Sequence, residues 1–313
     1  MPAMMFPFFR SSARVTTRTT LRCGLSDTAM DSGNDSFARV LTSINSDGIA
    51  HVQLNRAHKL NALDLKMFEA IADAASTLMT DRNIRAVILS GKGRAFCTGL
   101  DIQSMLQNNP RKSLDRLLER PSGYGGNYTE VGNLAQDVGY LWRSLPVPVI
   151  AVLHGMCYGG GMQIALGADF RLATPDCKLS IMESKWGLIP DMSASITLRE
   201  LVRMDVAKEL TMTGRIISGK EATELGLVTR NVDDPMVEAF TLASEISQRS
   251  PDSVALSKKL YQETWVAPET YCLQVETKLQ KQLLSTWNQV AASGRNFGWK
   301  LPYFKRGKGS DNS

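Results

Sequence analysis

The chain has 313 residues, of which 43% are hydrophobic and 21% are charged, as is ordinary for a globular enzyme. No apolar run approaches the roughly 18 residues of a membrane-spanning helix, so a membrane span is not expected. The five cysteines are scattered without a C-x-x-C pair, which predicts reduced thiols and argues against a disulfide framework or a structural zinc site. The length allows one large domain or two modest ones.

Residues 1–26 differ in composition from the rest of the chain. They contain no acidic residue, are rich in Ser and Thr, and carry an arginine at every fourth position, at Arg10, Arg14, Arg18 and Arg22. A helix would place these arginines on one face, and the composition is typical of a mitochondrial transit peptide. We therefore predict a leader and linker over residues 1–36 and a location in the mitochondrial matrix; the alternative is a disordered extension without a targeting role. Without these four arginines the formal net charge of +5 falls to +1, so charge gives no support for nucleic-acid binding.

An α/β core is predicted over residues 37–235. Residues 37–44 and 49–54 alternate apolar and polar side chains around Asp47-Gly48, which is a β-hairpin signal. Asp64 is placed to cap a helix that extends over 64–79. Short buried strands follow at 86–89, 147–153 and 168–173, separated by predicted helices. Such alternation of strands and helices is typical of a layered α/β fold.

The pattern from Ser193 onward is almost entirely helical. Predicted helices cover 193–202, 206–212, 220–225, 235–249, 252–264 and 269–292. We therefore assign residues 236–313 to a C-terminal helical region that docks on the core or assembles subunits. The irregular segment 107–128, in which Pro, Gly and Asn are frequent, is predicted to be either a binding loop or a variable surface loop.

Two strand-to-helix turns carry the chemistry suggested by the sequence. The triplet Gly159-Gly160-Gly161 follows a buried strand and precedes a short helix, whose first N–H groups have no partner within the helix. Glycine lets a ligand approach these N–H groups closely. The segment 91–101 makes a second turn of the same kind and leads into a helix start at Asp101. One N–H group from each turn can bind a single oxygen and form an oxyanion hole.

These turns belong to a longer set of motifs that resembles a known family. KLNAL (59–63), GRAFCTGLD (93–101), HGMCYGGGMQIALGADFRLA (154–173), ESKWGLIPD (183–191) and GLVT (226–229) occur in the order found in the enoyl-CoA hydratase/isomerase, or crotonase, superfamily. The resemblance covers about residues 37–265. It implies a ClpP-like spiral of ββα units with a helical C-terminal region that assembles trimers, often paired into hexamers. It also implies acyl-CoA thioester substrates and a reaction that requires no metal or redox cofactor.

The resemblance also implies roles for particular residues. The oxyanion-hole N–H groups would belong to Leu100 and Gly160. The groups that hold CoA would come from Lys59, Leu60, Ala62, Cys97, Thr98, Gly99 and Asp101. Glu183 matches one of the two glutamates that activate water in the family's hydratases, and the position of the other is occupied by Gln163, which is neutral and cannot take a proton.

The loss of one acid at Gln163 favours double-bond migration over hydration, because a single carboxylate can remove a proton and return it elsewhere. The 3-enoyl-CoA isomerases have their base at the Glu183 position. Asp191 lies eight residues later in a G-L-x-x-D turn, as in dienoyl-CoA isomerases, although those enzymes usually carry an aspartate where this chain has Gln163. We predict an acyl-CoA double-bond isomerase of fatty-acid β-oxidation, with Glu183 as proton shuttle and Asp191 as a second acid/base. A cap at the start of the following helix is the alternative role for Asp191, as it is for Asp101.

Two other functions stay open at this point. One is an enoyl-CoA hydratase with a changed acid/base pair. The other is a non-catalytic homologue that binds acyl-CoA or RNA, for which the basic run 300–308, KLPYFKRGK, would be the contact; a neighbouring subunit's CoA would explain that run equally well.

Overall fold

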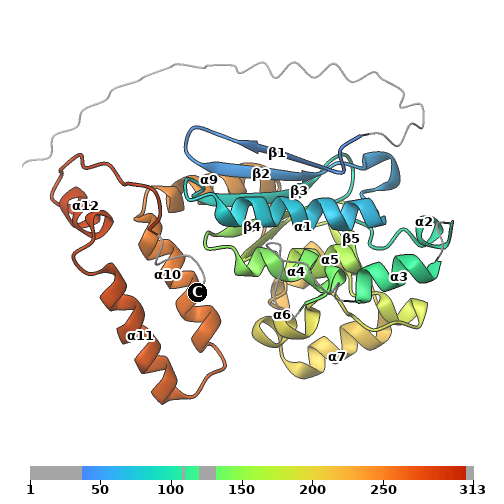
Figure 1. The fold of residues 1–313 in the computed structure, drawn as a ribbon. Coiled ribbons are helices and arrows are strands. Elements are labelled where there is room, and N and C mark those ends of the chain that lie inside the picture. Colours follow the sequence, from blue (N-terminus) through green and yellow to red (C-terminus); the bar gives the residue numbers. More distant parts are fainter. Residues whose placement is uncertain (1–36, 108–109, 120–131, 308–313) are drawn as a thin grey trace, which may run out of the picture. The chain divides into compact units, whose positions relative to one another are not determined.

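The computed structural model describes residues 37–107, 110–119 and 132–307 (Figure 1). The predicted leader and half of the irregular segment 107–128 lie outside the described residues. The chain from Ser36 onward forms one unit.

A six-stranded sheet forms the centre of the molecule, with the strand order β1-β2-β3-β4-β6-β9. Its strands are β1 (Val40–Ile44), β2 (Ile49–Leu54), β3 (Ala86–Gly91), β4 (Val149–Leu153), β6 (Phe170–Ala173) and β9 (Arg230–Asn231). The first two strands form the predicted hairpin, and Asn45 closes its turn by accepting hydrogen bonds from the N–H groups of Asp47 and Ile49. All other neighbours in this sheet are parallel.

A second, three-stranded sheet supports the site. It contains β5 (Met156–Tyr158), β7 (Lys178–Ser180) and β8 (Ile217–Ser218) in the order β5-β7-β8. The N–H group of Gly159 donates to Ser180 O at 2.9 Å, so the pairing of β5 with β7 continues into the glycine triplet. The small sheet therefore fixes where the helix after the triplet begins.

The predicted helices lie close to their expected boundaries, with one exception, and the segment 107–128, predicted to be a loop, contains the helix Pro110–Leu118. The helices are α1 (Leu65–Thr80), α2 (Ile102–Gln107), α3 (Pro110–Leu118), α4 (Leu134–Ser144), α5 (Gly160–Leu166), α6 (Ala194–Leu201), α7 (Met204–Thr213), α8 (Gly219–Glu224), α9 (Pro235–Ser247), α10 (Pro251–Thr264), α11 (Glu269–Leu283) and α12 (Trp287–Asn296), with short 3-10 turns η1 (Ala57–Lys59) and η2 (Glu183–Trp186). The predicted single helix over 269–292 is wrong, because the chain breaks between α11 and α12. Ser285 adopts a φ of 65°, and the Thr286 side chain accepts from Gln289 N as the cap of α12. Ser and Thr favour such caps because their hydroxyls compete for backbone groups.

The apolar side chains of the large sheet alternate between two faces. Val87 and Leu89 of β3 point into the main core with α1 and α4, whereas Ala86 and Ile88 point into a smaller core beneath α9. Figure 1 shows α1 in front of the sheet and α9 behind it. This layered arrangement confirms the predicted α/β class. The site turns leave the sheet on the side of the main core.

The C-terminal helices form an arm beside the core (Figure 1). Helices α10 and α11 pack as a hairpin through a small cluster around Leu256, Val275 and Leu279. Asp252 of α10 binds Asn288 of α12 through Oδ2 at 2.7 Å and the N–H group of Gly307 through Oδ1 at 2.6 Å. Residues 300–307 of the basic run therefore pack against the arm of their own chain.

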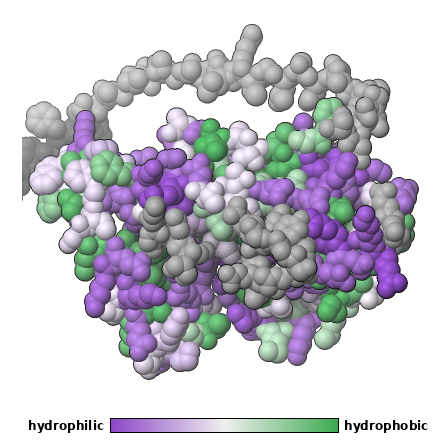
Figure 2. All heavy atoms as spheres, in the orientation of Figure 1, coloured by the Kyte–Doolittle hydropathy of each residue, from purple (hydrophilic) through white to green (hydrophobic). Residues whose placement is uncertain are grey.

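The surface is predominantly polar. Figure 2 shows polar side chains over most of the face in view, with apolar ones scattered among them. Within the described ranges, no helix combines the length and the apolar character needed to cross a bilayer.

Candidate active site

The two strand-to-helix turns lie side by side because their incoming segments pair. Cys97 N donates to Met156 O at 3.2 Å, and Tyr158 N donates to Cys97 O at 2.9 Å. A Cβ atom at Gly99 would lie only 2.9 Å from Tyr158 O and 3.4 Å from Gly160 N, and Gly99 has a φ of 86°. Only glycine meets both conditions, so Gly99 lets the first turn approach the N-terminus of α5.

The N–H groups of Leu100 and Gly160 are available to a ligand. Leu63 N donates to Gly99 O at 2.8 Å, and Asp101 N donates to Leu63 O at 3.0 Å. In this parallel bridge the N–H group of Leu100 itself points away from Leu63. Gly160 is the first residue of α5, so its N–H group has no partner within the helix. Neither N–H group donates to another atom of the described chain, and this is the arrangement predicted for an oxyanion hole.

Glu183 lies at the start of η2 with a side chain that is nearly buried. Its Oε1 accepts a hydrogen bond from Gln163 Nε2 at 2.6 Å, whereas Oε2 is buried and has no hydrogen-bond partner within the described residues. A Cβ at Gly159 would lie 3.6 Å from Oε1, which places the carboxylate beside the glycine triplet. Burial raises the pKa of Glu183; the hydrogen bond from Gln163 opposes that effect and the charge of Asp191 adds to it.

Gln163 is 1% exposed and makes hydrogen bonds in two directions. Its Nε2 donates to Glu183, and its Oε1 accepts from Met192 N at 2.8 Å. Met192 in turn packs against the glycine triplet, since a Cβ at Gly160 would lie 2.8 Å from Met192 Sδ and 2.9 Å from Leu63 Cδ1. Gln163 thus connects the carboxylate to the apolar wall beside the Gly160 N–H group.

Asp191 is exposed, and its charge contributes to the raised pKa of Glu183, so the two carboxylates are close enough to interact. Desolvation by neighbouring groups also raises the pKa of Asp191 itself. The alternative role as a helix cap is wrong: α6 begins after Ser193, and no side chain caps it.

The residues assigned to CoA binding lie on two adjoining loops. Thr98 N donates to Leu60 O at 3.2 Å, which joins the loop of Lys59, Leu60 and Ala62 to the loop of residues 97–101. The Lys59 side chain is exposed. Cys97 is buried, and burial raises the pKa of its thiol to about 12, so it is a packing residue and not a nucleophile.

Asp101 caps α2, as the alternative reading proposed. Its Oδ1 accepts from Ser104 N at 3.0 Å, and its Oδ2 pairs with Arg56 Nη1 at 2.6 Å. Burial acts to raise the pKa of Asp101, but the hydrogen bonds from Ser104 and Arg56 outweigh it and lower that pKa to about 2. Asp101 therefore holds the loop of Leu100 in place through Arg56.

Sequence reasoning missed the residue that joins the two loops most directly. Asn61 is fully buried, and its Nδ2 donates to Lys92 O, Ala95 O and Phe96 O at 3.0, 2.9 and 3.1 Å. Its Oδ1 accepts from Arg56 N at 2.8 Å. The signal available was an asparagine in the middle of KLNAL, because asparagine tolerates the left-handed φ of 57° found there.

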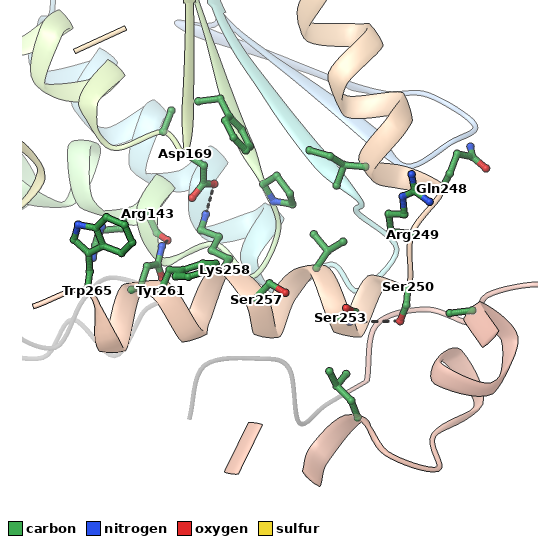
Figure 3. A pocket seen from close by; sticks show the side chains of 18 of the residues that line it. Arg143, Asp169, Gln248, Arg249, Ser250, Ser253, Ser257, Lys258, Tyr261 and Trp265 are labelled. Carbon is green, nitrogen blue, oxygen red and sulfur yellow. Dashed lines mark hydrogen bonds and ion pairs between the residues drawn. The ribbon is translucent and has the colours of Figure 1, made fainter. Parts of the chain in front are cut away.

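A cavity of about 940 Å³ lies elsewhere, between α10, α12 and the core (Figure 3). None of the candidate catalytic side chains lines it. Lys258 closes one side by donating to Asp169 Oδ2 at 2.7 Å, to Trp142 O at 3.1 Å and to Val147 O at 3.0 Å. These contacts attach α10 to the core, so we place the chemistry at Glu183 and not in this cavity. In the parts of the chain that the structure describes, no group of His, Cys, Asp and Glu side chains is arranged to hold a metal ion.

Comparisons with known proteins show what the chain is similar to. The chain is 31% identical over 230 residues to enoyl-CoA hydratase EchA19 of Mycobacterium tuberculosis, covering 73% of this chain and 82% of that protein. It is also 31% identical over 221 residues to the mouse mitochondrial Delta(3,5)-Delta(2,4)-dienoyl-CoA isomerase, covering 67% and 64% of the two chains. The crystal structure of an enoyl-CoA hydratase from Bacillus anthracis superposes with a TM-score of 0.75 at 26% identity, covering 85% and 99%, which confirms the predicted crotonase fold. Residues 45–297 match the model of one family, and the chain belongs to it: the enoyl-CoA hydratase/isomerase family.

Proposed function

We propose that the protein is an acyl-CoA double-bond isomerase of fatty-acid β-oxidation, which converts 3-enoyl-CoA or 3,5-dienoyl-CoA to the 2-enoyl or 2,4-dienoyl isomer. The observation that carries the proposal is the pairing of Glu183 with a neutral Gln163. The relatives do not separate the two reactions, because one named a hydratase and one named an isomerase are equally similar to this chain.

The first step is removal of a proton from C2 of the thioester. Glu183 Oε2 takes this proton, and the electron pair moves onto the thioester oxygen to form an enolate. The N–H groups of Leu100 and Gly160 donate hydrogen bonds to that oxygen. Each such donor is typically worth about 3–4 kcal/mol of transition-state stabilisation. The raised pKa of Glu183 makes the carboxylate a better base than an exposed glutamate.

The second step returns the proton further along the acyl chain. Protonated Glu183 donates to C4 of a 3-enoyl substrate, and the electron pair of the enolate re-forms the thioester carbonyl with the double bond at C2. For a 3,5-dienoyl substrate the proton goes to C6, and we propose that Asp191 is the acid at that end. In the family's hydratases a second glutamate stands at the Gln163 position, and the neutral amide found here cannot transfer a proton.

A panel of 2-enoyl-, 3-enoyl- and 3,5-dienoyl-CoA substrates tests this proposal in the wild-type protein and in Glu183→Gln. We expect isomerisation by the wild-type protein and a loss of at least about 1,000-fold in kcat for the variant, typical of removing an essential base. Hydration of 2-enoyl-CoA as the main activity would establish the hydratase alternative. Binding of acyl-CoA without turnover of any substrate would establish the non-catalytic one.

We also propose that copies of the chain assemble into trimers or hexamers through the C-terminal arm. The tip of the α10–α11 hairpin exposes large apolar side chains to 60% or more, at Tyr261, Trp265, Val266 and Leu273. Exposed apolar patches of this kind mark interaction surfaces. Sedimentation velocity of the wild-type protein and of Trp265→Glu tests this; a monomeric wild-type protein would contradict it.

The proposed location is the mitochondrial matrix. The support is the arginine-rich, acid-free composition of residues 1–26 and a relative whose name places it in mitochondria. A fluorescent reporter fused to residues 1–40 is expected to enter mitochondria, and a cytosolic reporter would refute the assignment.

A further inference from the structure

We infer that Gln163 is a positioning residue whose fixed amide confines the moving proton to a single oxygen of Glu183 and holds Met192 against the glycine triplet. This inference rests on the proposed role of Glu183 as proton shuttle, and it adds how that shuttle is oriented.

The orientation of the Gln163 amide follows from its two partners. Met192 N carries a hydrogen and can only donate, so the atom of Gln163 that faces it at 2.8 Å has to be the carbonyl oxygen Oε1. The amide nitrogen Nε2 therefore faces Glu183 Oε1 at 2.6 Å, and it can only donate. A flipped amide would break both hydrogen bonds, in a place where Gln163 is 1% exposed and water cannot replace them.

This orientation makes the two oxygens of Glu183 unequal. Oε1 already accepts from Gln163, so a proton placed on Oε1 would collide with a donor. Oε2 is buried and has no partner within the described residues, so it is the atom that receives the substrate proton. Because Oε1 keeps accepting from Gln163 in either state, the proton stays on Oε2 until it is returned. For a 3-enoyl substrate the same oxygen then serves both steps, and both transfers occur on one face of the acyl chain.

The second hydrogen bond of Gln163, from Met192 N, also fixes the position of Met192 beside Gly160. Met192 is 5% exposed, and its sulfur would lie 2.8 Å from a Cβ atom at Gly160. Holding the backbone of Met192 therefore keeps an apolar wall beside the Gly160 N–H group that binds the thioester oxygen. The base and the oxyanion hole keep their relative positions through one side chain.

Gln163→Met tests the inference, because methionine has a similar shape but cannot make either hydrogen bond. Gln262→Met is the matched control, since the Gln262 amide donates to Arg143 O at the far end of α4. We expect Gln163→Met to lower kcat about 10- to 100-fold with KM changed less than about threefold, as for a small misplacement of a catalytic group. Thermal melting of each variant checks that it is folded.

Two further readouts separate positioning from a merely structural role. Burial raises the pKa of Glu183 and the Gln163 hydrogen bond opposes that rise, so in Gln163→Met the acidic limb of the pH–rate profile should move to higher pH. With substrate deuterated at C2, the fraction of label carried to the product should fall, because a freed carboxylate can rotate and exchange its proton with water. The control Gln262→Met is expected to match the wild-type protein both in the acidic limb of the pH–rate profile and in the fraction of label transferred.

Gln163→Glu provides the rescue. While its own carboxyl is protonated and Glu183 is ionised, it can donate to Glu183 and accept from Met192 as the amide does, so activity should approach that of the wild-type protein and decline as the second carboxyl ionises. An unchanged kcat, acidic limb and label transfer in Gln163→Met would overturn the inference while leaving the function intact. Retention of activity in Glu183→Gln would instead overturn the proposed function.

Discussion

Glu183→Gln should make the protein inactive and more stable. In the folded state the carboxylate of Glu183 is 8% exposed and Oε2 has no hydrogen-bond partner in the described chain, whereas in the unfolded state water solvates both oxygens. The glutamine amide carries no charge and keeps an oxygen that can accept from Gln163. The substitution therefore removes a cost that folding imposes only on the wild-type chain.

The sign of the pH dependence follows from the raised pKa. A carboxyl group whose pKa is higher in the folded state binds its proton more tightly there, so its contribution to stability is present below the unfolded pKa of about 4.3 and is lost as pH rises through the folded pKa. At pH 7 the wild-type protein has lost this contribution to stability, whereas Glu183→Gln has no carboxyl at this position and loses nothing. The two proteins should converge in stability toward pH 4.

The magnitude can be bounded from the buried oxygen. Leaving a buried polar group without a partner costs about 1–3 kcal/mol, and more when it is charged. The glutamine NH2 group at the Oε2 position also has no partner, so only the extra cost of the charge is removed, and we expect a gain of about 1 kcal/mol at pH 7. For a protein of this size 1 kcal/mol shifts Tm by about 2–4 °C. Thermal and urea unfolding between pH 4 and pH 8 would measure the difference.

Glu200→Gln is the matched control for this prediction. Glu200 accepts from Arg143 at 2.5 and 2.9 Å, so neutralising it removes the partner of a largely buried guanidinium. The same chemical change should therefore destabilise the protein at pH 7. Equal destabilisation by both substitutions would refute the reasoning, because it would show that the Glu183 charge is as well compensated as that of Glu200.

Three other substitutions have defined outcomes. Asn61→Asp replaces a donor to three buried carbonyl oxygens with an acceptor and should cost about 3–5 kcal/mol of stability in urea unfolding, and a cost below 1 kcal/mol would contradict the bracing role. Met192→Ala should raise kcat/KM for C2-methyl-branched relative to straight-chain 3-enoyl-CoA, because it opens space beside Gly160; an unchanged ratio counts against Met192 as the wall. Lys258→Met should cost about 3–5 kcal/mol and, in a double-mutant cycle, less in the background of Asp169→Asn; additive costs would show that the pair is not coupled.

Local signals in the sequence were sufficient for much of the fold. The hairpin at Asp47-Gly48, the cap at Asp64 and the glycine triplet were predictable because each depends on a residue's own backbone preference and on its immediate neighbours. The break between α11 and α12 was missed although Ser285 and Thr286 mark it, because the apolar spacing on both sides was read as one helix. Periodicity alone does not show where a helix stops.

Long-range contacts were not predictable in the same way. Asn61 binds carbonyl oxygens of residues 92–96, and Lys258 binds Asp169 across 89 positions of the chain. Nothing in the local sequence of either residue indicates its partners. Glu183 and the turn at Gly99 do lie beside the glycine triplet, but only the structure separates Asp101, which holds a loop, from Glu183, which has an oxygen free.

Gln163 shows why residue identity alone could not decide the chemistry. In the sequence, Gln163 stands where the family's hydratases have a glutamate. The replacement is compatible with an isomerase, a weakened hydratase or an inactive protein. In the structure the same amide leaves Glu183 Oε1 engaged and Oε2 free, so one carboxylate keeps one atom for proton transfer. A hydratase needs two proton-transfer groups on one water, whereas a double-bond isomerase needs one proton to leave and return. An arrangement with a single free oxygen suits the second requirement, and the orientation of the amide, fixed by Met192 N, is what sets it.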